Sequence, residues 1–489
     1  MNNRGSKLVN LTSENSLSVF VIAILLGLFV SMLGEYVVYG ILGLLFVVPF
    51  IIYGEKYIIF FIIVTLFTLV GDINKDLRAV IHILDFSLLA LLFLYHYGFQ
   101  IKEYPKIPRS LIYFLLLYYF SMVLAIVMSE HVYDGLQKIG RQTIFFGVAY
   151  LLYSLIRKED DLKSILYGII AASVIIAFST MINFYSQGFE LADYAAGIAV
   201  RVTGLMSNIL ATTTYFIVAM PLLIVFLLTQ DKRSIKNLLW IFIIVLLIGI
   251  ILTASRSAML AIIASTMIIF YFYNKKLITS LLLILIFISL IFLFIPPFNE
   301  ISSIIFRIES GLSQRQHYWS LAYNMIKDNL LFGIGPGSYG YEMYNYFPVM
   351  LNSWIGKVII ETNLITGGNN NSHNFFLVFF SDMGVPGLLT ALTLPVVFFK
   401  IALKTIKKYK NSNKVTYYTV IGLAAAGTSM FVRGFVDGIG LLAYGFITAD
   451  MPFWLMFISL IYYNLKIPND IKSLSSGSPE QIVNNSTSD

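Results

Sequence analysis

Long apolar runs separated by short polar connections dominate this sequence and restrict what it can fold into. In lipid every backbone group must be hydrogen-bonded internally, so each run is expected to cross as a helix of about 20 residues. The chain is 58% hydrophobic and 12% charged, far below the roughly 25% charged residues of soluble domains. The sequence therefore predicts an all-α polytopic membrane protein with about 12–14 transmembrane helices. The predicted spans are 17–33, 37–53, 58–70, 80–97, 110–128, 142–156, 164–184, 209–228, 238–252, 257–273, 277–296, 374–399, 415–431 and 451–465.

Positive charges gather in alternate connections between these runs. KEYPKIPR, RKEDDLK, QDKRSIK and KIALKTIKKYKNSNK all fall on one side if the spans alternate. Connections rich in Lys and Arg stay in the cytoplasm. We therefore expect both termini to be cytoplasmic.

One connection is much longer than the others and defines the domain organisation. We expect residues 1–297 to form the N-terminal part of the bundle, 298–373 a large periplasmic loop, 374–467 the C-terminal part, and 468–489 a disordered cytoplasmic tail. Within the loop, helical spacing over 314–331 predicts an amphipathic helix. Its apolar stripe comprises Tyr318, Ala322, Met325, Ile326 and Leu330.

Several classes of function are excluded or disfavoured by residue usage. The chain has no cysteine, which excludes disulfides and thiolate metal sites. It has five histidines without metal-ligand spacing, so we expect no metal. GIGPGSYG has glycines but no preceding strand, so a nucleotide-binding motif and a cofactor are not expected. The net charge of +7 is explained by the cytoplasmic connections, and no nucleic-acid partner is expected.

A few costly charges fall on the predicted outer face. Arg201 precedes one span, Arg256 sits between two apolar runs with almost no loop, and Arg315 starts the amphipathic helix. Charges in or beside a bilayer indicate function by default, although an interfacial arginine can also snorkel to lipid headgroups. Guanidinium groups on one face would suit a diphosphate. His373 precedes the next span; by composition alone a lone histidine is more often structural than catalytic. Arg433 and Asp437, in FVRGFVDG, are further charges of this kind.

Four motifs in order carry a resemblance to a known family. HNFFLVFFSDMGVPGLL begins at His373 and reads His-Asn, nine residues, Gly, two residues, Gly-Leu. RVTGLMSN, TASRSAML and SQRQHYWSLAYNMIKDNLLFGIGPGSYGY precede it. Together they resemble the bacterial O-antigen ligase and O-antigen polymerase family, over roughly residues 195–465.

The resemblance implies a glycosyltransferase that moves an oligosaccharide or polysaccharide from undecaprenyl diphosphate on the periplasmic side. The acceptor would be a hydroxyl of lipid A–core in a ligase, or of another lipid-linked repeat unit in a polymerase. It implies a metal-independent, inverting reaction. By correspondence of motifs, His373 would be the catalytic base, and Arg201, Arg256 and Arg315 would bind the diphosphate. Membrane lipids would be the remaining partners.

Four residues are candidates for contact with the sugar or acceptor. Tyr339, Tyr341 and Trp319 offer flat faces on which sugar rings could stack, but packing or an interfacial position explains each of them at least as well. Asn374 would either bind sugar hydroxyls or cap the helix that follows it.

Other functions stay open at this stage. The motifs do not separate ligase from polymerase, and a capsule polymerase of a Gram-positive organism also fits them. A polysaccharide transporter or lipid-linked glycan flippase would need charges or broken helices near the bilayer midplane. Asp85, Pro221, Pro386 and Pro395 are candidates for such features.

Overall fold

The computed structural model describes residues 55–68, 75–189, 201–206, 208–294, 315–346 and 371–466. Within these ranges all regular elements are helical, and every predicted span that falls in them coincides with a helix. The predicted spans 17–33 and 37–53, the boundary at 297/298 and the predicted tail 468–489 lie outside the described residues. The helices are α3 (Glu55–Thr68), α4 (Lys75–Tyr97), η1 (Ile101–Glu103), α5 (Arg109–Val127), α6 (Val132–Ser154), α7 (Glu159–Ser186), α9 (Ile209–Thr229), α10 (Arg233–Thr253), α11 (Arg256–Tyr273), α12 (Lys275–Phe294), α14 (Arg315–Asp328), α15 (Tyr339–Glu342), α17 (Phe375–Tyr409), α18 (Lys414–Gly434) and α19 (Ile447–Leu465).

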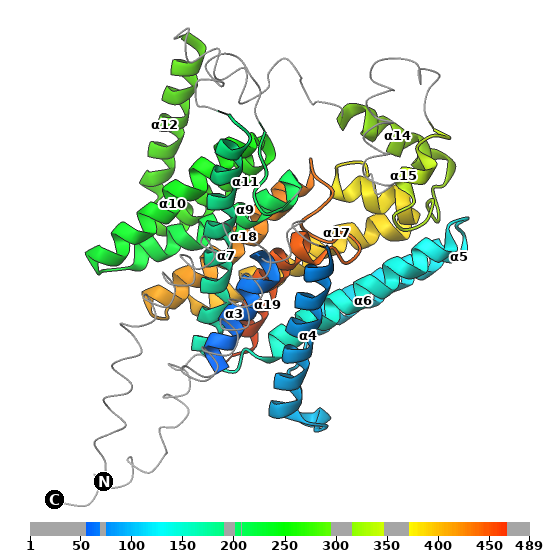
Figure 1. Ribbon diagram of the computed structural model, residues 1–489, viewed down its shortest axis with the longest axis horizontal. Coiled ribbons are helices and arrows are strands. Elements are labelled where there is room, and N and C mark those ends of the chain that lie inside the picture. The colour runs from blue at the N-terminus through cyan, green and yellow to red at the C-terminus, as the bar shows by residue number, and fades with distance from the viewer. Residues whose placement is uncertain are drawn as a thin grey trace, which may run out of the picture.

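Seven of the described helices are long and apolar enough to cross a membrane: α5, α7, α9, α10, α11, α17 and α18. This confirms the predicted all-α polytopic membrane fold. Helices α7, α9 and α18 are largely buried and occupy the centre of the bundle (Figure 1). Helices α5 and α11 instead expose much of their apolar surface, as expected for helices that contact lipid. Helices α5 and α6 form one flank, and α10, α11 and α12 form the other.

Helix α17 begins just after the His-Asn motif and is broken in the first third of its length. Gly384 has φ 61° and ψ −153°, a backbone conformation open essentially to glycine alone. In an unbroken helix the Val385 N–H would bond to the Ser381 carbonyl. Pro386 has no N–H to offer the Asp382 carbonyl. The break therefore frees three backbone groups inside an apolar bundle, where each unsatisfied group is costly.

The segment that follows α14 satisfies those groups. The Val385 N–H donates to the Leu330 carbonyl at 3.0 Å, and the Ser381 and Asp382 carbonyls accept from the N–H groups of Ile334 (3.0 Å) and Gly335 (2.9 Å). A side chain at Gly333 would collide with the backbone of Asp382, so glycine permits this approach. The backbone of this segment, which includes the start of the glycine-rich turn region, therefore forms the hydrogen bonds that the break in α17 leaves unmade.

The amphipathic helix predicted over 314–331 is α14, and its expected apolar stripe faces inward. Tyr318, Ala322, Met325 and Ile326 are buried, whereas Leu330 lies beyond the helix and is exposed. The stripe forms a small core with α15 and the turn region, and Leu377 of α17 packs against it. Helices α14 and α15 thus sit on α17 at one end of the bundle (Figure 1).

Candidate functional site

The polar run that ends in His373 forms a tight turn ahead of α17. His373 has φ 49°, a left-handed conformation uncommon for a residue with a side chain. Its N–H donates to Asn371 Oδ1 at 2.8 Å, which stabilises the turn. Asn374 follows as the N-cap, and its Oδ1 accepts from the N–H groups of Phe376 (2.9 Å) and Leu377 (3.1 Å). This local geometry fixes the direction in which the His373 side chain extends from the backbone.

The imidazole of His373 lies against α14. Its ring centroid is 5.1 Å from that of Tyr318, in an edge-to-face arrangement. Burial lowers the pKa of His373 below its usual value; the Asp437 carboxylate opposes this shift, and the Arg315 cation adds to it. A lowered pKa keeps the ring neutral at neutral pH. A neutral imidazole can accept a proton, which is the state a general base requires.

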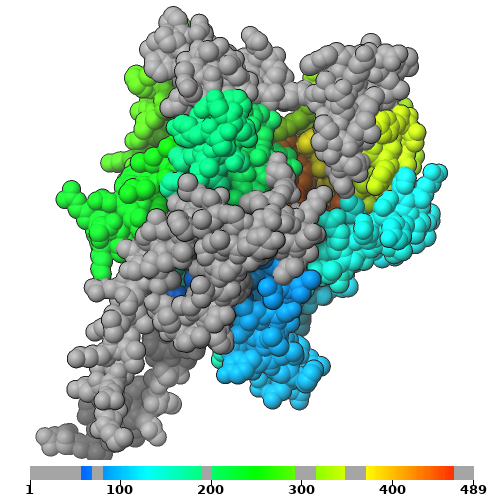
Figure 2. Space-filling view, in the orientation of Figure 1, coloured from blue at the N-terminus to red at the C-terminus, as the bar shows by residue number. Residues whose placement is uncertain are grey.

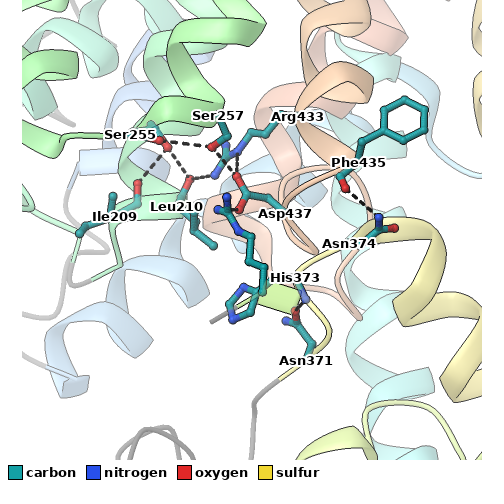
Figure 3. A network of polar contacts seen from close by, with 12 residues as sticks. Ile209, Leu210, Ser255, Ser257, Asn371, His373, Asn374, Arg433, Phe435 and Asp437 are labelled. Atoms are coloured by element: carbon teal, nitrogen blue, oxygen red, sulfur yellow. Dashed lines mark hydrogen bonds and ion pairs between the residues drawn. The ribbon is translucent and has the colours of Figure 1, made fainter. Parts of the chain in front are cut away.

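Asp437, just beyond the end of α18, is the hub of the polar network (Figure 3). Its Oδ1 accepts from Arg315 Nη2 at 2.7 Å, and its Oδ2 accepts from Arg433 Nε at 3.0 Å and from Ser257 Oγ at 2.7 Å. Asp437 is fully buried, so its charge depends on these donors. The carboxylate therefore ties together the starts of α11 and α14 and the end of α18.

Arg433 is held from the opposite side by α9. Its Nη1 donates to Thr214 Oγ1 at 2.6 Å, and its Nη2 donates to the Leu210 carbonyl. With 1% of its surface exposed, its guanidinium is surrounded by protein. We therefore assign it a structural part in the network.

Arg201 and Arg256 both lie at the connection between α10 and α11. The Val202 N–H donates to the Leu252 carbonyl at 3.1 Å, and Arg201 Nε donates to the Thr253 carbonyl at 3.4 Å. Helix α10 ends at Thr253, Ala254 follows as its C-cap in a left-handed conformation, and α11 begins at Arg256. The chain thus reverses over two residues, which sets Arg256 at the turn next to the segment that holds Arg201.

The structure brings Arg315 and His373 to one network around Asp437, and it places Arg256 next to a member of that network in the chain. Arg256 is adjacent to Ser257, which bonds to Asp437, and Asp437 in turn pairs with Arg315. Figure 2 shows a recess between green and yellow atoms, with orange-red atoms of the chain's C-terminal part at its floor. Arg201 is exposed, while Arg256, Arg315 and His373 are partly buried. Arg201, Arg256 and Arg315 thus come from three separate segments of the chain.

The four candidate sugar contacts fall into different environments. Tyr339 is 1% exposed and donates its hydroxyl to the Tyr318 carbonyl at 2.7 Å, so it packs in the core under α14. Asn374 caps α17, and its Nδ2 also donates to the Phe435 carbonyl at 2.7 Å. Tyr341 is 44% exposed and lies against His131. Among the described residues, the buried indole N–H of Trp319 meets no hydrogen-bond acceptor. Of the three aromatic rings, that of Tyr341 is the most exposed.

Reasoning from the sequence did not assign roles to Asp437, Arg433 and Ser257. The signal for the first two was present, because FVRGFVDG places two opposite charges four residues apart in an apolar region. Ser257 had no such signal, since a serine in a membrane helix commonly bonds to its own backbone. Its partner lies 180 residues away in the chain.

Within the described residues, no group of three or more His, Cys, Asp or Glu side chains is placed to hold a metal ion. Cationic and neutral donors dominate the network instead. Metal independence stays a prediction of the family resemblance.

These features define a class: a multi-pass, all-helical membrane protein with a cationic site at one end of its bundle. Residues 240–392 match the sequence profile of the O-antigen ligase family. The match confirms the resemblance over a range that holds Arg256, Arg315 and His373; Arg201 and Asp437 lie outside it. No curated protein matches the chain. The family match supports glycan transfer at a membrane as the general function.

Proposed function

We propose that this protein transfers an oligosaccharide or polysaccharide from undecaprenyl diphosphate to an acceptor hydroxyl, at the periplasmic face of the inner membrane. The observation that carries the proposal is the Asp437 network, in which Asp437 pairs with Arg315 and both charges act on the pKa of His373. Arg256 precedes the network residue Ser257 in the chain, and Arg201 bonds to the Thr253 carbonyl at the end of α10. Permanent cations suit a diphosphate, and a neutral imidazole suits a base. The acceptor is the core of lipid A in a ligase or a lipid-linked repeat unit in a polymerase.

The chemistry follows from these groups. The acceptor oxygen attacks the anomeric carbon while the bond from that carbon to the diphosphate oxygen breaks. His373 takes the hydroxyl proton, and the lipid diphosphate leaves with one more negative charge. Fixed guanidinium groups stabilise that charge as it develops, and no metal takes part. A single displacement of this kind inverts the anomeric configuration.

The proposed reaction is tested with purified protein in detergent and a lipid-linked donor. Wild-type protein is expected to form the glycosidic product in the presence of EDTA. H373A should lower turnover by about 100-fold or more, the range for loss of a general base. R201A and R256A should weaken donor binding as well, and H317A, on the outer helix but outside the network, should stay active. Full turnover by well-folded H373A protein would remove the base assignment.

Two features of the bundle, the break in α17 and the surroundings of Asp85, favour transfer over transport. Transporters expose irregular helices and charges to a central cavity. In this chain the break near Pro386 is filled by the backbone of 330–335, and Asp85 accepts from Thr65 Oγ1 at 3.1 Å. Product formation in detergent, where no gradient exists, separates the two functions.

Ligase and polymerase are distinguished in cells that lack the protein. Loss of a ligase leaves lipid A–core without any O-antigen, whereas loss of a polymerase leaves single repeat units attached. In a Gram-positive cell, loss of capsule polymer would identify a capsule polymerase. The surface-glycan profile on a gel is therefore the deciding measurement.

A further inference from the structure

Asp382 is a buried carboxylate that the proposed reaction does not use. It lies in α17, two residues before the break at Gly384, and is 1% exposed. Its Oδ2 accepts from the Gly337 N–H at 2.8 Å and from the Tyr444 hydroxyl at 2.7 Å. Lys138 of α6 supplies a positive charge near Asp382, and the Lys138 side chain fills the space beside Gly337.

A carboxylate in an apolar bundle is costly unless its partners compensate for lost hydration. Here the partners come from three elements that are distant in sequence: the turn after α14, the segment before α19, and α6. The Gly337 bond holds the glycine-rich turn and the Tyr444 bond holds the segment before α19, while within α17 the Ser381 hydroxyl donates to Asp382 Oδ1 at 3.4 Å. The side chain therefore acts mainly between elements.

We propose that Asp382 is a positioning residue that locks α14 onto α17 and so sets Arg315 relative to His373. The inference rests on the proposed function for its catalytic consequence, but the lock itself is a structural claim. The main chain supplies three hydrogen bonds between the turn and the break, and Asp382 adds the fourth through Gly337.

The lock reaches both ends of the reacting pair. His373 precedes α17 by two residues, so it moves with the outer part of that helix. Arg315 begins α14, and α14 joins the docked turn through the small core around Tyr318 and Ile334. If the turn is released from α17, the position of Arg315 relative to His373 is no longer fixed. A displacement of about 1 Å in a catalytic group can cost roughly 100-fold in rate.

The structural claim is tested by distance measurement, which needs no activity. The chain has no cysteine, so a cysteine pair carries spin labels without background. Exposed positions 323 on α14 and 389 on α17 form the reporter pair, and 116 on α5 with 389 forms the reference pair. In D382L the 323–389 distance distribution should broaden and lengthen, while the 116–389 distribution should not change.

Variants at matched positions control for burial and charge. D382N keeps an oxygen that can accept from both donors, so it should retain the narrow distribution. Y444F removes one of the two donors and should give an intermediate result. D450N alters another buried carboxylate, one that accepts from the Gly440 and Ala443 N–H groups, and should leave the reporter distance unchanged.

Kinetics then separate positioning from simple instability. D382L should lower turnover by about 100-fold, while donor KM should rise less than in R201A or R256A because Arg201 and Arg256 belong to other elements. The acidic limb of its pH profile should move to higher pH, since Arg315 no longer lowers the pKa of His373. Partial unfolding would reduce the amount of active protein and leave that midpoint in place.

The outcomes are distinguishable. A narrow, wild-type 323–389 distribution in D382L overturns the lock, whatever the activity. If the distribution broadens and wild-type protein transfers no glycan, the lock stands and the proposed function fails. Broadening with unchanged turnover and pH midpoint shows that the lock does not position the reacting groups, and overturns the inference.

Discussion

At the scale of single residues, His373 is defined by its surroundings more than by its own chemistry. The left-handed turn held by Asn371 aims it, Tyr318 packs against it, and burial keeps it neutral. Among the charged groups, Asp437 raises and Arg315 lowers its pKa. In the proposed reaction, the pH range in which His373 can act as a base is therefore set by its burial and by its two charged neighbours.

The pH dependence of turnover tests this electrostatic arrangement. Turnover requires neutral His373, so it should be lost as pH falls through the lowered pKa of that residue. In R315Q a cation that lowers the pKa is gone, so the pKa rises and the acidic limb should move to higher pH. The measurement is kcat against pH with saturating donor.

R201Q is the matched control, because Arg201 is not among the charges that shift His373. Its acidic limb should stay at the wild-type midpoint even if KM for the donor rises. An unmoved limb in R315Q would mean that another group titrates.

At the scale of elements, the break in α17 explains why a glycine and a proline stand at positions 384 and 386 of this chain. Gly384 makes the break, Pro386 leaves a carbonyl unpaired, and the turn after α14 bonds to the exposed groups. The break that Gly384 permits thus creates a site where the segment after α14 binds to the helix.

Stability measurements on glycine variants test the break. An added Cβ at Gly384 would lie 2.5 Å from the Leu331 carbonyl carbon, in a backbone conformation that disfavours side chains. G384A should therefore destabilise the protein by about 1–3 kcal/mol or more. Thermal unfolding in detergent is the measurement.

Gly140, in α6, provides the comparison. An added Cβ there meets no atom within 4 Å, so G140A should be neutral or stabilising by up to about 1 kcal/mol. Equal melting temperatures for G384A and G140A would contradict the account of the break.

At the scale of the whole molecule, buried charges connect helices that are far apart in the sequence. Arg433 joins α9 to the end of α18, and Asp437 extends that connection to α11 and α14. The site is therefore built into the packing of the bundle.

Loss of Arg433 alone should destabilise the protein more than loss of both Arg433 and Asp437. R433M leaves Asp437 with one cation fewer in the interior and should destabilise the protein by about 3–5 kcal/mol. R433M/D437N removes the stranded charge and should recover part of that loss without recovering turnover. Unfolding and transfer assays on the same samples give both readouts. Additive losses in the double variant would contradict the coupling.

Much of the helical framework was predictable because apolar periodicity and run length are local properties. Every predicted span within the described ranges coincides with a helix, and the amphipathic stripe of α14 faces inward as expected. The charges that form the network were also visible as costly residues in apolar context. Tyr339 shows the limit of this reasoning, since the same tyrosine suits a sugar platform or a core, and only its neighbours distinguish the two.

The sequence alone determined that the chain is a helical membrane protein, which residues are unusual there, and which family its central part resembles. Tertiary structure decided which unusual residues meet. Asp437 bonds to Ser257 across 180 positions and to Arg315 across 122, and the turn after α14 bonds to the break in α17. Hydrophobic burial depends on the sum of local apolar surface, whereas a buried hydrogen bond depends on the exact placement of two distant groups.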